Sequence, residues 1–254
     1  MSLYITSLNS GSNGNCYYIG NATEAVLIDA GISCRETERR MYRLGLSMQK
    51  IKAIFISHEH TDHTRGTAVL SRKYRMPVYI TAATHHNSRL WLKPELVKPF
   101  SSDAPIQIGG LSVTAFPKQH DASEPHSFTI TGNGITIGIF TDIGIACEQV
   151  VRHLSQCHAA FLESNYDDKM LEEGNYPLFL KRRIRGDEGH LSNLQALDLF
   201  TTHRPRFMSL LVLSHLSAQN NSPQLVHDLF SKHANGTQIV VASRYEETEV
   251  YSVG

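Results

Sequence analysis

The sequence predicts an α+β protein in which β-sheets are covered by helices on their outer faces. Three observations lead to this prediction. Short apolar runs bounded by Gly, Asn and Ser dominate the first third of the chain, strand-like runs recur through the rest, and helical spacing of apolar residues appears between the later runs. Strands interleaved with amphipathic helices are typical of sheets packed against helices.

The first third is expected to be an antiparallel meander followed by a helix. Its strands should cover Leu3 to Leu8, Cys16 to Ile19 and Ala25 to Asp29, with a Gly/Asn/Ser turn between the first two. Ser33 with Glu36 three residues later has the pattern of a helix N-cap, so a helix is expected over 33–44.

From residue 53 onward, strands and helices are expected to alternate. A short buried strand over 53–57 leads into a His-rich segment, and helical spacing follows over 65–74. Further strands are expected over 78–80, 111–116, 128–131, 135–140, 159–163, 208–213 and 238–241. The later helices are expected near 146–154, 178–184, 191–202 and 222–231.

Composition is consistent with a single domain over residues 1–254. With 41% hydrophobic and 19% charged residues, the chain can bury a sizeable core, and it contains neither a linker of biased composition nor a solenoid repeat. Lys plus Arg and Asp plus Glu number 24 each, so global charge neither indicates nor excludes a polyanionic substrate. The four cysteines form no CxxC pair and are expected to be reduced thiols.

The chain is expected to be soluble and cytoplasmic, with no membrane partner. Its first residues lack a basic region followed by an apolar one, and no stretch approaches the roughly 18 apolar residues that a membrane span needs. The sequence gives no indication of an oligomeric interface.

The most informative segment is a His-x-His-x-Asp-His pattern that follows a strand. It consists of His58, His60, Asp62 and His63. Neutral imidazole and carboxylate are the ligands that a catalytic divalent metal prefers, and a turn lets these side chains converge on two adjacent ions. A histidine-rich surface loop is the alternative, but the preceding strand and the ligand candidates downstream favour a metal site.

This segment resembles the signature of the metallo-β-lactamase superfamily, which implies a four-layer αββα sandwich. The family's later ligands correspond to His120, Asp142 and His215, each after an expected strand, although each alone is also compatible with a structural role. By resemblance, His58, His60 and His120 hold one metal, and Asp62, His63 and His215 the other. Asp142 and a hydroxide would bridge the two metals.

Two adjacent divalent cations lower the pKa of a bridging water toward neutrality and polarise the bond under attack. Asp62 would then orient the hydroxide. Zinc is the expected metal, with manganese or iron as alternatives, because His/Asp sites accept all three.

Two further segments resemble the transfer-RNA 3′-processing branch of the superfamily. They are Phe161 to Asp167, which contains Glu163, and Gly189 to Asn193, which contains His190. The resemblance implies that His190 protonates the leaving oxygen while Glu163 orients it, as an imidazole near neutral pH can do. A solvent-exposed helix terminus for His190 and a structural hydrogen bond for Glu163 are the alternatives.

Over nearly its whole length the chain is similar to the bacterial YycJ/WalJ (VicX) group. The matching segments are 10–15, 26–31, 58–63, 120–125, 163–165, 181–184, 189–193, 215–217 and 220–221. The resemblance implies a cytoplasmic phosphodiesterase with 5′ to 3′ exonuclease activity on double-stranded DNA. The chain departs from the group at Tyr166, where the group has His, and this leaves substrate specificity open.

Candidate substrate-binding residues come from four places in the sequence. The dense basic run is suited to gripping phosphates, although a solvated helix face would look the same, and the Gly-flanked turn near the N-terminus is equally compatible with a plain tight turn. Two family segments add three more polar candidates. The full set is Ser12, Asn15, Asn165, Lys181, Arg182, Arg183, Arg185, Ser192 and Asn193.

The leading hypothesis from the sequence is therefore a dinuclear metallo-phosphodiesterase, with DNA as the expected nucleic-acid partner. A thioester or lactone hydrolase of the glyoxalase II type is the enzymatic alternative, although such an enzyme has little use for the basic run or for Glu163 with His190. A metal-bound regulatory protein with vestigial catalysis is a third class, and the complete ligand set argues against it.

Overall fold

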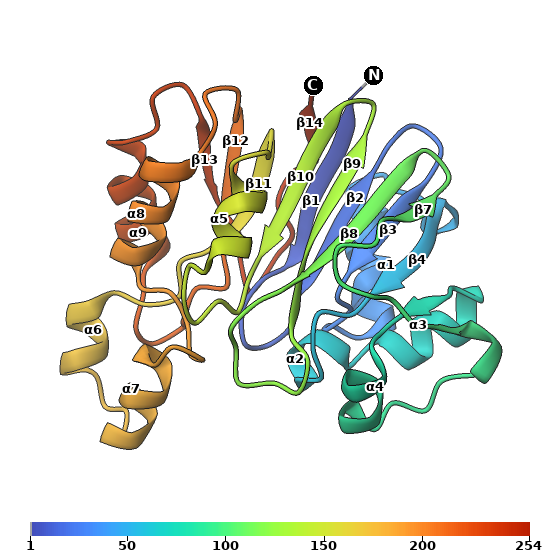
Figure 1. Ribbon diagram of the computed structural model, residues 1–254, viewed down its shortest axis with the longest axis horizontal. Helices are drawn as coiled ribbons and strands as arrows, with labels where there is room; N and C mark the ends of the chain where they lie inside the picture. Colours follow the sequence, from blue (N-terminus) through green and yellow to red (C-terminus); the bar gives the residue numbers. More distant parts are fainter. Residues whose placement is uncertain (1) are drawn as a thin grey trace.

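A computed structural model of the chain describes residues 2–254. Within them, two β-sheets face each other and helices cover both outer sides (Figure 1). The described chain thus has the four-layer αββα arrangement that the sequence predicted.

The first sheet is built mainly by the N-terminal part of the chain. β1, β2 and β3 pair antiparallel, which confirms the predicted meander, and β3 to β6 pair parallel. In spatial order the seven described strands are β14 (Tyr251–Val253), β1 (Leu3–Asn9), β2 (Cys16–Gly20), β3 (Ala25–Ile28), β4 (Ile51–Phe55), β5 (Val78–Tyr79) and β6 (Val97–Lys98).

The second sheet is built by the C-terminal half of the chain. β10 to β13 run parallel, whereas β7 to β10 form antiparallel hairpins. In spatial order the seven described strands are β13 (Gln238–Val241), β12 (Leu210–Ser214), β11 (Ala159–Glu163), β10 (Ile135–Phe140), β9 (His126–Gly132), β8 (Leu111–Pro117) and β7 (Ile106–Ile108).

The helices fall into two groups. On the outer faces of the sheets lie α1 (Cys34–Arg43), α3 (Thr67–Tyr74), α5 (Glu148–Leu154), α8 (Asn193–His203) and α9 (Pro223–Ser231). Around the lower edge in Figure 1 lie α2 (Thr61–Thr64), α4 (Ala82–Ser88), α6 (Asp168–Glu173) and α7 (Leu178–Arg185). Two 3₁₀ turns complete the set, η1 (Met48–Lys50) and η2 (Pro94–Leu96). Among the described residues, no helix has both the length and the apolar character needed to cross a bilayer.

Alternation along the strands divides the core into three layers. In β2, Tyr17 and Ile19 face the second sheet while Tyr18 faces the outer helices, because successive side chains of a strand point to opposite faces. In β11, Phe161 likewise faces the first sheet and Leu162 faces the helices α5, α8 and α9. Both faces are buried, so the central strands read as nearly continuous apolar runs.

The predicted elements agree with the structure except where elements are short or polar. The backbone N–H of Glu36 donates to Ser33 Oγ, 3.2 Å away, as the capping pattern predicted. Strands β6, β7 and β14 were missed because two or three residues carry too little alternation. Helix α4 was missed because its AATHHNS sequence lacks an apolar stripe, and α6 was missed as well. The single-domain organisation stays a prediction, although the inter-sheet core contains both Leu3 and Val253.

Candidate metal centre

The seven predicted ligands meet at one edge of the two sheets, beyond the carboxyl ends of four strands. The HEHTDH segment follows β4, His120 follows β8, Asp142 follows β10 and His215 follows β12. β10 and β12 run parallel in the same direction as β8, so their carboxyl ends share an edge. The topology therefore gathers side chains that lie more than 150 positions apart in the sequence.

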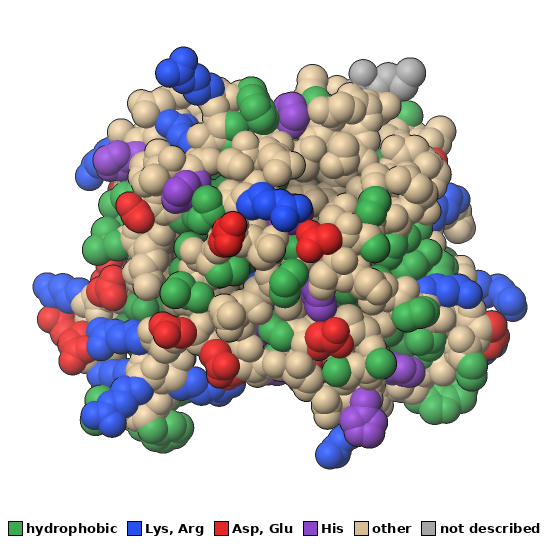
Figure 2. Space-filling view, in the orientation of Figure 1, with side chains coloured by type: hydrophobic (Ala, Val, Ile, Leu, Met, Phe, Trp, Pro, Cys, Tyr) green, Lys and Arg blue, Asp and Glu red, His purple; other side chains and the backbone are tan. Residues whose placement is uncertain are grey.

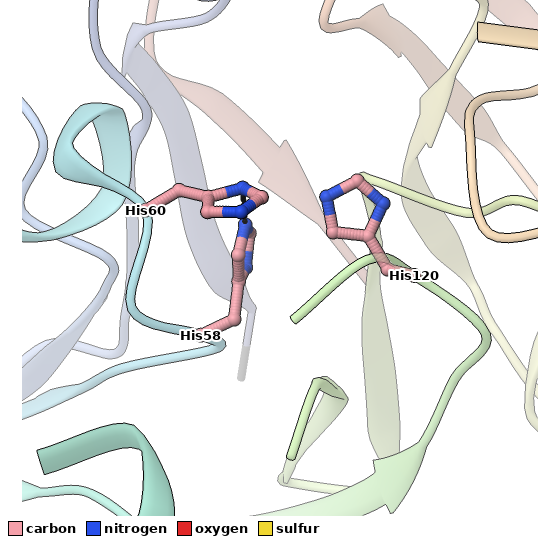
Figure 3. A group of neighbouring side chains, drawn as sticks. All are labelled: His58, His60 and His120. Carbon is pink, nitrogen blue, oxygen red and sulfur yellow. Dashed lines mark hydrogen bonds between the residues drawn. The ribbon is translucent and has the colours of Figure 1, made fainter. Parts of the chain in front are cut away.

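The candidate ligand atoms form overlapping clusters, and the atoms of each cluster lie within 4.8 Å of one another. Figure 3 shows the first of these, with the rings of His58 and His60 almost perpendicular and the ring of His120 opposite them. The sets are His58, His60 and His120; His58, His63 and Asp142; Asp62, His63 and His215; and Asp142, Glu163, His190 and His215. The predicted ligands are thus brought together.

Four of the histidines are oriented by the protein through Nδ1. His63 donates to Asp29 Oδ2 at 2.7 Å, His120 to the Gly189 carbonyl oxygen at 3.1 Å, and His215 to Glu163 Oε1 at 3.0 Å. His58 donates to Ser57 Oγ at 2.8 Å, since that hydroxyl donates its own proton to Asp29. Metal-binding histidines are commonly fixed in this way, so that Nε2 is the atom available to a cation.

Unpaired atoms at the centre of the cluster test whether a cation fits. Among the described residues, His120 Nε2, His215 Nε2 and Asp142 Oδ2 are buried and lack a hydrogen-bond partner. His63 Nε2 lies 3.1 Å from Asp142 Oδ2, where the surrounding carboxylates favour a positive charge. Buried polar atoms are seldom left unpaired, and a cation between these atoms would satisfy them. The residues therefore fit divalent metal ions.

The protonation states of the cluster are set by burial and by its carboxylates. Burial lowers the pKa of His120 to about 4 and holds that of His58 well below its usual range, so both rings are neutral, as metal ligands must be. At His63, burial is outweighed by the neighbouring carboxylates, Asp142 foremost, which raise its pKa to about 10. The carboxylates therefore stabilise a positive charge at His63.

Two ligands are held in a backbone conformation that is uncommon for residues other than glycine. Asp142 has a φ of 55° and His215 a φ of 57°, both in the left-handed region. Asp29, which holds His63, has a φ of 60°. Such conformations cost about 1–3 kcal/mol and concentrate at functional sites, where surrounding contacts over-determine them.

Glu163 connects the metal cluster to His190. Its Oε1 accepts from Nδ1 of His190 at 2.7 Å and from Nδ1 of His215 at 3.0 Å, while its Oε2 accepts from the Ile143 backbone N–H at 2.8 Å. Burial alone would raise the pKa of Glu163, but the charge of His190 and the hydrogen bonds from both histidines lower it to about 2. A permanently ionised carboxylate therefore orients His190.

The segment before His190 is packed tightly between the metal loops and α7. A Cβ atom on Gly189 would lie 2.2 Å from the Ile184 carbonyl oxygen and 2.3 Å from that of Arg183. The backbone N–H of His190 donates to the same Ile184 oxygen at 2.9 Å, and Asp121 N–H donates to Glu188 at 3.0 Å. The carboxyl end of α7 therefore fixes the place of His190.

A cleft with a volume of about 340 Å³ opens above the ligands. Of the predicted substrate-binding residues, Ser12, Asn165 and Arg183 line it. Arg183 spans the cleft and pairs with Asp121, whose other carboxylate oxygen lies 3.3 Å from His120 Nε2.

The other predicted substrate-binding residues lie elsewhere. Asn15 is fully buried and donates toward His63 Nε2 (3.0 Å) and Asp62 Oδ2 (3.3 Å), so it supports the ligand cluster. Ser192 caps α8, and Asn193 belongs to a buried amide cluster with Asn221. Lys181 and Arg185 bind Glu172, and Arg182 is exposed.

Tyr166, the departure from the family pattern, is also buried. Only 2% of it is exposed, and burial raises its pKa to about 12. Its backbone oxygen accepts from Asn193 N–H at 2.8 Å. It lies outside the residues that line the cleft.

Sequence reasoning missed several residues that shape the site. Asp29 bonds His63 and Asp121 pairs with Arg183, and in both cases the partner is distant in sequence. Lys118 is buried, its pKa lowered by burial, and its Nζ donates to the Thr141 carbonyl oxygen at 2.6 Å, next to Asp142. Its place two residues before His120 was the one available signal.

The fold and the ligand cluster together define a metallo-β-lactamase-fold hydrolase. The sequence pattern of the beta-lactamase superfamily domain matches residues 24–215, and the chain belongs to this superfamily. Within it the chain belongs with the YycJ/WalJ group: it is 33% identical over 238 residues to the exodeoxyribonuclease YycJ of Bacillus anthracis, covering 89% of this chain and 86% of that protein.

Two further similarities agree with this assignment. The exodeoxyribonuclease WalJ of Streptococcus pneumoniae strain D39 is 29% identical over 225 residues, covering 87% of this chain and 84% of that protein. In structure, the chain resembles Zn(2+)-bound PqqB from Methylobacterium extorquens with a TM-score of 0.75 at 14% identity, covering 99% of each chain. The last similarity concerns the fold alone.

Proposed function

We propose that this chain is a dinuclear metal-dependent phosphodiesterase that acts on DNA as an exonuclease, with 5′ to 3′ polarity by family resemblance. The observation that carries the proposal is the Glu163–His190 pair, 2.7 Å apart and joined through His215 to the metal cluster. Hydrolysis of a phosphodiester needs a proton for the leaving alkoxide, and this pair provides a donor at the edge of the ligand set. The names of the YycJ and WalJ relatives support the same substrate class.

The ligands divide into two sets with one shared residue. His58, His60 and His120 would hold one cation; Asp62, His63 and His215 would hold the other; Asp142 would bridge them, as it lies in a cluster with residues of both sets. When bound, two divalent cations lower the pKa of a water molecule toward neutrality and stabilise charge on the phosphate. Zinc is proposed first, and manganese or iron suit the same ligands.

The proposed reaction is the hydrolysis of one phosphodiester bond. Water adds its oxygen to phosphorus, the bond from phosphorus to the leaving oxygen breaks, and the products are a phosphomonoester and a free hydroxyl. Asp62 orients the attacking water by accepting its hydrogen bond. His190 donates its Nδ1 proton to Glu163, so in the doubly protonated ring Nε2 is the atom that delivers a proton to the leaving oxygen; the protons of the attacking water pass to the phosphate product and to solvent, from which the ring is reprotonated.

Arg183 and the polar rim would bind the substrate strand. The guanidinium of Arg183 lines the cleft, where it pairs with Asp121, and it can turn to a phosphate with little displacement. Ser12 and Asn165 lie on the same cleft. Arg182, exposed on α7, would add long-range attraction for the nucleic acid.

The test compares substrates on metal-loaded protein. Wild type, His60→Ala and His227→Ala are incubated with 5′-phosphorylated duplex DNA, single-stranded DNA, RNA and a thioester. The expected result is DNA cleavage by wild type and by His227→Ala, whose histidine is exposed on α9 and belongs neither to the ligand clusters nor to the cleft lining, and none by His60→Ala. Thioester cleavage with all nucleic acids left intact would contradict the proposal and support the glyoxalase II type.

A further inference from the structure

The cleft has a polar floor and an apolar wall. The floor consists of the metal ligands and His190. The wall comes from α7, the segment before it and the loop after β12. Its members are Tyr176, Leu180, Ile184 and Leu216. Such a surface suits a ligand that has a charged end and a flat apolar end.

The apolar wall is not required by the core of the protein. Leu180 and Ile184 are one helical turn apart and so share a face of α7 with Arg183, which lies between them. Among the described residues of α7, none is buried. Figure 2 shows Lys and Arg side chains gathered at the lower left of the molecule, where Figure 1 places α6 and α7. The helix therefore offers the cleft both apolar contact and positive charge.

The wall is nevertheless fixed relative to the reacting groups. Gly189 lies so close to the last turn of α7 that a Cβ would meet two carbonyl oxygens within 2.3 Å, and His190 N–H is bonded to that turn. Arg183 is bonded to Asp121, which also lines the cleft. A group that rests on Tyr176 and Leu180 therefore has a set position with respect to His190.

The volume of the cleft limits the size of the ligand that it can hold. Pockets for small ligands range over about 300–1,000 Å³, and this cleft, at about 340 Å³, lies near the lower limit. One nucleotide suits such a space, whereas a stacked base pair with its neighbours does not. Nucleic-acid enzymes that need access to one nucleotide commonly take it out of the stack and hold its base against an aromatic side chain.

We propose that the wall of Tyr176, Leu180, Ile184 and Leu216 receives the base of a single unpaired nucleotide at the end of the strand. This inference rests on the proposed nuclease function. It means that the end of a duplex must fray by one pair before hydrolysis, and that Tyr176 sets the affinity for the strand end by stacking rather than by hydrogen bonding.

The experiment compares Tyr176→Ala, Tyr176→Phe and Phe179→Ala with wild type. Phe179 is the matched control, because it is an aromatic residue 73% exposed on the same helix and absent from the cleft. The substrates are duplexes with a paired or a mismatched terminal pair, and a duplex whose terminal nucleotide is abasic and so has no base for the wall to receive.

On DNA, Tyr176→Ala is expected to raise KM about tenfold, whereas Tyr176→Phe and Phe179→Ala stay within about twofold of wild type. Wild type should prefer the mismatched end, and the abasic end should be cleaved equally by all four proteins, which also shows that they are folded. Terminal 2-aminopurine, followed by fluorescence in a His190→Ala background, should be quenched unless Tyr176 is replaced by Ala.

Unchanged KM in Tyr176→Ala, or equal cleavage of paired and mismatched ends, would overturn the inference while leaving the nuclease proposal intact. If wild type cleaves no DNA at all, the proposed function itself fails. The two failures are therefore distinguishable.

Discussion

The metal cluster and the α7 wall face each other across one cleft, yet they are built in opposite ways. The candidate ligands emerge from strand ends and are buried except for His60 and Asp62, and three of them are tethered by Asp29, Glu163 and the Gly189 carbonyl. The wall comes from a helix that buries none of its described residues and is attached mainly at its carboxyl end. Under the proposed function, the core of the fold would supply the chemistry and a peripheral segment would select what reaches it.

The largest effect is expected at the shared ligand. Asp142→Asn keeps the shape of the side chain but removes the charge that would bridge the two cations, so activity should fall on the order of 10⁴-fold. Metal analysis of the purified variant should show fewer ions per chain than wild type. Full metal content with normal activity would refute the bridging role, and Asp228→Asn on exposed α9 is the control.

Removing the proposed acid should have the next largest effect. His190→Ala is expected to slow DNA cleavage by about 10²- to 10⁴-fold with metal content unchanged. A p-nitrophenyl ester of thymidine monophosphate, whose leaving group needs no proton, should be affected much less. Equal losses on both substrates would argue that His190 only binds the phosphate.

Loss of the carboxylate that orients His63 should be smaller. Asp29 accepts both the His63 Nδ1 proton and the Ser57 hydroxyl, so Asp29→Asn should weaken metal binding about 10- to 100-fold. Competition with a coloured zinc chelator measures this affinity. An affinity equal to that of wild type would show that His63 is oriented by other contacts.

The smallest expected effect lies where the two regions touch. Gly189→Ala places a Cβ against two carbonyl oxygens of α7, and such overpacking should cost about 1–3 kcal/mol and lower the melting temperature by several degrees. Activity should fall with it, because His190 moves. Gly186→Ala, whose nearest atom would be 3.3 Å away, is the matched control and should change less; a Gly189→Ala protein as stable as wild type would disprove the tight contact.

The sequence predicted the two regions unequally, for a physical reason. His58, His60, Asp62 and His63 lie within six positions at the end of a recognisable strand, so local pattern and ligand chemistry were sufficient. His120, Asp142 and His215 were proposed from the family resemblance, with the added observation that each follows an expected strand. Alternation and helical spacing predicted sheets covered by helices, and the family resemblance added the four-layer αββα arrangement.

The contacts around the ligands were beyond sequence reasoning. That Asp29 holds His63, or that the Gly189 carbonyl holds His120, depends on how distant loops pack, and nothing local distinguishes these residues from other aspartates and glycines. The basic run over 181–185 was recognised, but the sequence alone could not tell which of its charged side chains would face the cleft. In the structure, only Arg183 of the four predicted basic residues lines the cleft.

The close approach of Gly189 to α7 also sets a boundary for engineering. Because residues 183, 184, 189 and 190 share hydrogen bonds and van der Waals contact, the helix cannot be exchanged for a relative's helix at its carboxyl end without moving His190. A chimaera that replaces the segment up to Leu180 and retains everything after it would keep that junction. The boundary of an exchangeable segment would therefore lie inside α7, after Leu180, rather than in a loop.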